Sequence, residues 1–392
     1  MDEASRTRWP VIAGLGTAQT LAWASSYYLI AILAPAMARE TGSSQTAVFA
    51  AFSASLLISA VLGPRVGRTI DRFGGREVLA VSNLLFAAGL GLPAFAEGWL
   101  LLWLGWAIVG AAMGLGLYDA AFATLGHMYG TTARSAITGI TLIAGFASTV
   151  GWPLTAWGEV ELGWRGTCLA WAAAHIVLGL PLNLFVLPKL RTAQSASKTP
   201  ARPHVPMDSA MWLLGFAFAT GWLVSTAMAA HLPRLLEAAG ATTAQAIAAA
   251  ALVGPAQVAA RVLEAGFLSR FHPLVSARLS TITHPIGAAV LLIGGGWLAM
   301  PFTLLHGAGN GILTIARGTV PLAIFGPDNY GYRLGLLGAP ARILQAAAPL
   351  GFGMLIERYG AYALLFSSAA CLLATIALLA VSGRTATKSD AP

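Results

Sequence analysis

Five charged residues lie inside strongly apolar segments of this 392-residue chain: Asp119, Arg261, Glu264, Arg317 and Arg342. A charge at the centre of a lipid bilayer costs at least about 2.5–3.5 kcal/mol, so each of these side chains must face a partner or water. Three positive charges against two negative charges leave a positive excess. Because a guanidinium group binds carboxylates through paired hydrogen bonds, this excess suits a small anionic ligand.

The three arginines differ in what accompanies them. Arg261 has Gln257 and Glu264 at i−4 and i+3, on the same face of a helix. An ion pair of Arg261 with Glu264 that only stabilises the helix is an open alternative. Arg317 and Arg342 have no acidic residue within four positions, so their counter-charge must come from another helix or from a ligand. We predict that Gln257 and the three arginines contact substrate.

The acidic residues suggest proton coupling, because carboxylates buried in membranes commonly form proton relays. Asp119 is the first candidate and Glu264 the second, although a permanent salt bridge of Asp119 to an arginine would fit equally well. Gln19, Tyr27 and Tyr28 are predicted to line the substrate cavity. The alternative for the two aromatic rings is a role in packing alone.

Hydrophobic residues make up 57% of the chain, and the mean hydropathy is +0.72. Its apolar runs exceed the roughly 18 residues that indicate a membrane-spanning helix, so we predict an all-α polytopic membrane protein. Twelve spans are expected, at about 10–36, 45–64, 78–95, 99–127, 135–158, 166–187, 210–236, 244–268, 279–299, 301–326, 333–356 and 362–382. Gln19, Asp119 and the three arginines each fall about 14 Å from a cytoplasmic end, near the midplane of a core about 30 Å thick.

The longest polar interruption divides these spans into six and six. We predict an N-terminal six-helix bundle at 1–187, a cytoplasmic linker at 188–209 and a C-terminal six-helix bundle at 210–392. The segment "DRFGG" after the second span lies in register with "SRFHP" after the eighth. This faint repeat supports two pseudo-symmetric bundles, an organisation that many secondary transporters use.

The net charge of +8 comes from basic residues that we expect to set the membrane topology. Nucleic acid is therefore not an expected partner. The basic residues concentrate in segments that would be cytoplasmic if both termini were cytoplasmic, which is the topology we predict. The bacterial inner membrane is the expected location. Cys168 and Cys371 lie in apolar runs without metal-ligand spacing, so neither a metal site nor a cofactor is expected.

The loop "GRTIDRFGGREVL" is unusually rich in charge for so apolar a chain. Gly67, Asp71, Arg72, Gly74 and Arg76 resemble the signature G-x-x-x-D-R-x-G-x-[RK]-x-x-[LIVM] between helices 2 and 3 of the major facilitator superfamily. The resemblance implies a twelve-helix transporter that works by alternating access. In such a loop the glycines permit a tight turn and the charged residues form a conformational latch. The alternative is that the basic residues only enforce topology.

A further resemblance concerns helices 4 and 5. Tyr118, Arg134 and the triplet Gly163-Trp164-Arg165 are similar to the monocarboxylate-porter and oxalate-type branch of that superfamily. That branch uses cationic residues of helices 8 and 11 for substrate carboxylates, which implies roles for Arg261 and Arg342, and Tyr118 joins the predicted substrate site. The helix-4 arginine typical of proton-coupled drug exporters is absent.

These patterns together predict a secondary active transporter for a small organic anion of the carboxylate type, coupled to protons and acting as a monomer in the lipid bilayer. Efflux of a drug or metalloid is the alternative within the transporter class. A polytopic membrane enzyme is a remote alternative, because no nucleophile motif or paired-carboxylate motif accompanies Asp119. We therefore predict that the protein is not an enzyme.

Overall fold

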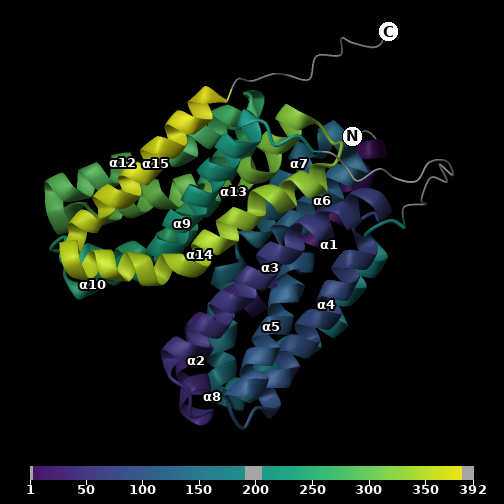
Figure 1. Ribbon diagram of the computed structural model, residues 1–392, viewed down its shortest axis with the longest axis horizontal. Coiled ribbons are helices and arrows are strands. Elements are labelled where there is room, and N and C mark those ends of the chain that lie inside the picture. Colours follow the sequence, from purple (N-terminus) through teal and green to yellow (C-terminus); the bar gives the residue numbers. More distant parts are fainter. Residues whose placement is uncertain (1–2, 190–204, 382–392) are drawn as a thin grey trace. The chain divides into compact units, whose positions relative to one another are not determined.

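The computed structural model describes residues 3–189 and 205–381 and shows helices throughout these ranges, without a strand (Figure 1). The predicted all-α class is confirmed. Most of the predicted linker, residues 190–204, lies outside the described residues. Contacts between helices divide the chain into a first unit, Met1–Pro206 with Pro327–Ala339, and a second unit, Met207–Gly326 with Pro340–Pro392.

The first unit contains the helices drawn from purple to teal-blue in Figure 1. Its elements are α1 (Glu3–Trp23), η1 (Ala24–Tyr28), α2 (Leu29–Glu40), α3 (Gln45–Phe73), α4 (Arg76–Gly91), η2 (Leu92–Phe95), α5 (Trp99–Gly116), α6 (Tyr118–Tyr129), η3 (Gly130–Ala133), α7 (Arg134–Ala144), α8 (Ala147–Ala174), η4 (His175–Gly179) and η5 (Leu182–Val186). Both α3 and α4 pack against α5, while α1 packs against α7 and α8 contacts α2 and α4.

The second unit contains the helices drawn from teal to yellow. Its elements are α9 (Ser209–Ala238), α10 (Thr243–Ala250), α11 (Val253–Gly266), η6 (Leu268–Arg270), α12 (Pro273–Gly294), η7 (Gly295–Leu298), α13 (Ala299–Phe325), α14 (Tyr330–Tyr359), η8 (Gly360–Tyr362) and α15 (Ala363–Ala380). Helix α12 packs against α13 and α15, α11 packs against α13, and α9 packs against α15. The first ten residues of α14 are grouped with the first unit.

Eight continuous helical stretches in the described residues are long and apolar enough to cross a membrane. The three longest are Trp99–Val186, Pro273–Phe325 and Tyr330–Ala380. Four glycines with positive φ interrupt these three longest stretches. Dividing the stretches at these glycines turns the eight into twelve segments of membrane length within the described residues. These glycines are Gly130, Gly163, Gly295 and Gly360. Glycine adopts this left-handed conformation without a steric penalty, which permits the chain to reverse there.

Several helices begin at side chains that bind the first free backbone amides. The Ser44 hydroxyl accepts an N–H bond at the start of α3, and the Asp208 carboxylate does so at the start of α9. At α10, Thr242 and Gln245 bind each other's backbone amides in a capping box. Such caps stabilise a helix by about 1 kcal/mol.

Candidate substrate and coupling sites

The three predicted arginines are all buried in the second unit, on three different helices. Arg261 on α11 donates from Nε to the Gly311 carbonyl oxygen of α13, at 3.4 Å. Arg317 on α13 places its guanidinium group 5.3 Å from the ring centre of Trp222 on α9. Arg342 lies on α14. Because a planar guanidinium group stacks favourably on an indole, Trp222 helps to hold Arg317 in the helix bundle.

Polar side chains accompany the arginines on α13 and α14 and bond to side chains of α9. Gln345, three residues after Arg342, donates to the hydroxyl of Thr226 on α9 at 3.3 Å. Ser225, also on α9, donates to Asn310 Oδ1 on α13 at 2.6 Å. These four residues and Trp222 were not predicted from the sequence. The available signal was weak, because isolated polar residues in membrane helices more often bond to their own backbone.

Gln257 and Glu264 lie on α11 with Arg261. Glu264 is fully buried and accepts a hydrogen bond from the Ser276 hydroxyl of α12, at 3.5 Å. Gln257 is half-buried, and its backbone packs closely against Gly311. The second unit therefore encloses three buried arginines and one buried acid among its described residues.

Asp119 belongs to the first unit and lies at a break in its helix. The predicted span 99–127 is two helices, α5 and α6, separated at Leu117, whose ψ of −173° is extended. Asp119 is buried in the first turn of α6, where the free N–H groups and the helix dipole favour negative charge. Broken membrane helices with exposed half-helix termini are typical of substrate and ion sites in transporters.

Gln19 lies beside this break. Its amide Nε2 donates to the Gly116 carbonyl oxygen at 2.6 Å, and its buried Oε1 has no hydrogen-bond partner among the described residues. The Tyr118 ring packs on Trp23 of α1, with ring centres 5.1 Å apart. The structure thus brings Gln19, Tyr118 and Asp119 to the same region of the first unit.

The two tyrosines of η1 belong to an aromatic cluster of the first unit. Tyr27 packs on Trp23 at 5.4 Å and on Phe52 of α3 at 5.4 Å, and Phe52 packs on Trp106 of α5 at 5.6 Å. Tyr28 lies 5.7 Å from Tyr27. Neither Phe52 nor Trp106 was predicted from the sequence as part of this cluster, since rings on different helices show no common spacing.

The charged loop after the second span is held mainly by backbone groups. Asp71 Oδ1 and Oδ2 accept the N–H groups of Gly331 and Tyr332, at 2.7 and 2.8 Å, in the first turn of α14. The Arg68 guanidinium group lies 4.4 Å from the Tyr332 ring centre, and the Gly67 backbone packs directly against Gly331. All of these residues belong to the first unit.

The remaining loop residues act within their own unit. Gly74 ends α3 with a φ of 83°, and the Arg72 guanidinium group lies 4.8 Å from the Phe73 ring centre. Arg76 donates from Nε and Nη2 to the Leu184 carbonyl oxygen in η5, at 2.8 and 2.6 Å. Arg76 therefore binds the end of the last helix of the first bundle. The predicted role of this loop as a latch stays a prediction.

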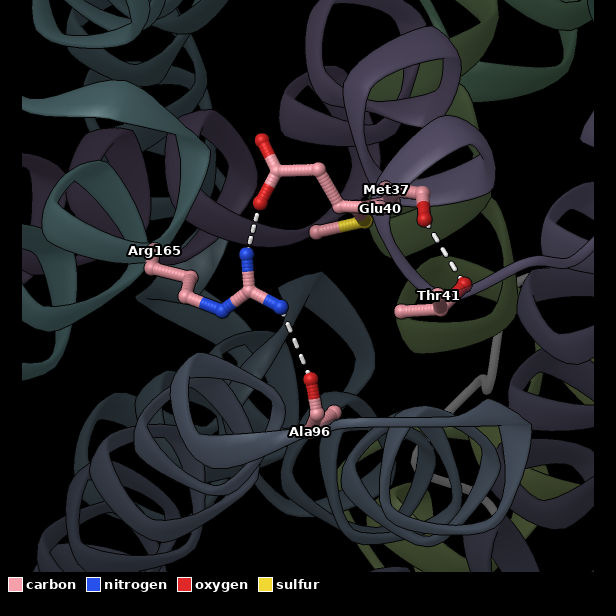
Figure 2. A network of polar contacts seen from close by, with 5 residues as sticks. All are labelled: Met37, Glu40, Thr41, Ala96 and Arg165. Carbon is pink, nitrogen blue, oxygen red and sulfur yellow. Dashed lines mark hydrogen bonds and ion pairs between the residues drawn. The ribbon is translucent and has the colours of Figure 1, made fainter.

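The triplet Gly163-Trp164-Arg165 lies in α8, and Figure 2 shows Arg165 between Glu40 and Ala96. Gly163 turns the chain with a φ of 69° inside α8, which places Arg165 between two other segments. Its guanidinium group forms an ion pair with Glu40 at the end of α2 and donates to the Ala96 carbonyl oxygen at 2.8 Å. The Trp164 ring packs on the guanidinium group at 4.4 Å.

Histidines that the sequence analysis left out of the site form buried polar clusters. In the first unit, His175 of η4 bonds to Ser25 of η1 and Asn83 of α4, both at 2.8 Å. In the second unit, the His284 and His306 Nδ1 atoms are 3.1 Å apart. His284 Nε2 also lies 2.9 Å from the hydroxyl of Ser367. Within the described residues, no group of three or more histidine, cysteine, aspartate or glutamate side chains could hold a metal ion.

Comparisons with known proteins agree with this architecture. Residues 15–305 match the family model described as Major Facilitator Superfamily. A Thermoproteus tenax protein described as an "uncharacterized 38 kDa protein in 23S RNA operon" is 28% identical over 351 residues, which is 89% of each chain.

Solved structures show the same fold at low sequence identity. The transporter FucP in its outward conformation is 15% identical with a TM-score of 0.73, covering 95% of this chain and 99% of that one. The proton:xylose symporter XylE is 13% identical with a TM-score of 0.73, covering 97% and 98%. The human organic anion transporter MFSD10 is 15% identical with a TM-score of 0.68, covering 96% and 100%.

Proposed function

Because this chain belongs to the Major Facilitator Superfamily of membrane transporters, we propose that its substrate is a small organic anion of the carboxylate type. The observation that carries the proposal is the charge buried in the second unit. Three arginines and one glutamate are buried there, so the described core of that unit has a positive excess. A low-dielectric environment strengthens the attraction of such an excess for an anion.

The proposed site is built from α9, α11, α13 and α14. The guanidinium groups of Arg261, Arg317 and Arg342 supply planar donors for a carboxylate, and Gln257 supplies an amide beside them. Trp222 orients Arg317, as its stacking distance of 5.3 Å supports. In the first unit we propose Gln19, Tyr27, Tyr28 and Tyr118 as further substrate contacts.

We propose that transport is coupled to protons through Asp119, with Glu264 as a second carboxyl group. The location of Asp119 at a helix break favours this role, because half-helix ends in transporters bind substrates and ions. Among the solved structures with this fold, two are described as proton symporters and one as an organic anion transporter. The fold therefore accommodates both proton coupling and anion transport.

The loop of Gly67, Asp71, Arg72, Gly74 and Arg76 is proposed to act as the latch of alternating access. Asp71 holds the first turn of α14 through two backbone amides, and a change of conformation would release them. We further propose that the protein is a monomer in the bacterial inner membrane. Its proposed parts are a six-helix bundle at 1–187, a cytoplasmic linker at 188–209 and a six-helix bundle at 210–392.

A thermal-shift panel on the detergent-purified protein tests the substrate class. It compares mono- and dicarboxylates and inorganic oxyanions with lipophilic cations and neutral drugs. A ligand at a hundred times its dissociation constant stabilises a protein by about 2.7 kcal/mol. We expect one carboxylate class to raise the melting temperature.

Three variants and one control locate the effect. Arg261→Gln, Arg317→Gln and Arg342→Gln are each expected to abolish the shift. Arg234→Gln removes an exposed arginine of the same unit, which pairs with Glu357 at 3.7 Å, and is expected to keep it. Stabilisation by cations or neutral compounds alone would overturn the anion proposal and favour efflux of a drug or metalloid.

A further inference from the structure

The buried cluster around His175 has no role in the proposed transport of an anion. The ring is fully buried, and its two nitrogens bond to side chains of two other elements. The Phe86 ring stacks on it, with ring centres 4.6 Å apart and an angle of 19° between the planes. Three segments of the first unit, η1, α4 and η4, therefore meet at one imidazole.

The hydrogen bonds fix the proton on Nδ1. Asn83 Nδ2 donates to the Leu79 carbonyl oxygen at 2.8 Å, which directs Oδ1 of the same amide towards His175 Nδ1, at 2.8 Å. Since Oδ1 can only accept, Nδ1 must carry a hydrogen. The opposite tautomer would place two acceptors against each other.

The Ser25 hydroxyl can pair with His175 Nε2 whether or not that nitrogen carries a hydrogen. Its Oγ lies 2.8 Å from His175 Nε2 and 2.8 Å from the Leu21 carbonyl oxygen, and its single hydrogen can serve only one of them. With a neutral ring the hydroxyl donates to Nε2. If Nε2 gains a proton, the hydroxyl hydrogen turns to the Leu21 oxygen and Oγ accepts the new N–H. Both states give each ring nitrogen a hydrogen-bond partner without moving a heavy atom.

We propose that His175 is a proton-binding site of the first bundle, one that takes a proton from the aqueous phase onto Nε2. In the resulting imidazolium each N–H donates to an oxygen, and hydrogen bonds from a charged donor are roughly twice as strong as neutral ones. The Phe86 face adds a cation–π contact. These terms offset part of the cost of burying a charge.

The backbone supports a functional site at this position. His175 begins the π-helix η4, and Ser25 lies in the π-helix η1. Single π-helical turns are rare and occur frequently at functional sites, because they shift side chains out of the regular helical register. Here two such turns face each other across one hydrogen bond.

No ionised group is among the described contacts of the ring, which are Ser25, Asn83 and Phe86. The titratable side chains described on the elements that pack against the cluster are Arg8 on α1, Tyr27 and Tyr28 on η1, Arg76 and Glu77 on α4, and Glu159, Glu161, Arg165 and Cys168 on α8. The arginines bond elsewhere, to Thr132, Leu184 and Glu40 respectively. Burial of the ring and its neutral partners therefore set its proton affinity.

Nitrogen-15 spectra of the full-length protein, labelled at histidine and reconstituted in lipid, test the site without any substrate. The His175 signals are those lost in His175→Gln. At about pH 8.5 we expect the neutral ring with hydrogen on Nδ1, and towards about pH 5 the doubly protonated ring. A neutral ring with hydrogen on Nε2, or a ring that stays neutral over this range, would overturn the proposal.

Two variants at the cluster give opposite expected shifts. Asn83→Asp places a carboxylate on Nδ1 and should move the protonation midpoint to higher pH by about one unit or more. Ser25→Ala removes the acceptor for the Nε2 hydrogen and should move it to lower pH. Ser367→Ala removes the matching hydroxyl beside His284 in the second unit and should leave the His175 midpoint unchanged. Equal midpoints in all three variants would contradict the mechanism, while the anion proposal would stand.

Discussion

At the scale of single residues, Asp71 leads to a direct prediction. Its carboxylate accepts two backbone N–H groups at the start of α14, where such groups have no partner within the helix. Asp71→Asn keeps the shape but removes the charge and one acceptor, so we expect the free energy of unfolding to fall by about 1–2 kcal/mol. Thermal unfolding in detergent measures the loss. Asp328→Asn, at an exposed position just before α14, should have no effect, and equal losses in both variants would contradict the assignment.

The same residues show how far sequence reasoning extends. The motif that contains Asp71 and Arg76 predicted the family, which the family match confirms, but it could not name the partners of these residues. Asp71 binds amides of residues 331 and 332, and Arg76 binds the carbonyl of Leu184. Backbone groups occur at nearly every residue, so they leave no mark in the sequence. His175 was missed for a related reason, because its partner Ser25 lies 150 residues away along the chain.

At the scale of helices, α14 contains a pair of glycines with opposite expected effects. Alanine normally stabilises a helix relative to glycine by about 1 kcal/mol. A Cβ atom at Gly335 would lie 2.5 Å from the Gly63 carbonyl oxygen and 2.6 Å from the Pro64 Cα of α3, whereas one at Gly351 would meet no atom within 4 Å. Gly335→Ala should therefore lower the melting temperature and Gly351→Ala should raise it. A higher melting temperature in Gly335→Ala would show that α3 and α14 do not pack this closely.

The sequence predicted where the membrane-spanning segments lie, but it did not predict the interruptions inside them. Apolar length indicated the spans, because a membrane core requires about 20 residues of helix. The same apolar residues gave no sign of the break at Leu117 or of the π-helices η1 and η4. Such irregularities depend on packing against neighbouring helices. They also position Asp119, which the sequence indicated as a coupling candidate, and His175, which was found only in the structure.

At the scale of the whole molecule, composition and the loop signature were sufficient for the all-helical membrane fold and for the family. Composition and the loop signature each depend on several residues, so a wrong interpretation of one residue does not change the predicted fold or family. The substrate class depends instead on a few buried charges, Arg261, Arg317 and Arg342 above all. Their placement in one unit supports an anion, but the sequence alone left an internal ion pair with Glu264 as an alternative.

The orientation in the membrane gives the last prediction. Cytoplasmic loops of membrane proteins carry an excess of lysine and arginine, and this bias predicts cytoplasmic termini here. Glu97 then belongs to an outer loop and Asp328 to an inner one, and both are exposed. The native Cys168 and Cys371 are buried, so background labelling should be low. In intact cells, a membrane-impermeant maleimide should label Glu97→Cys at once and Asp328→Cys only after permeabilisation. The reverse pattern would invert the topology and move the loop of Asp71 to the outer face.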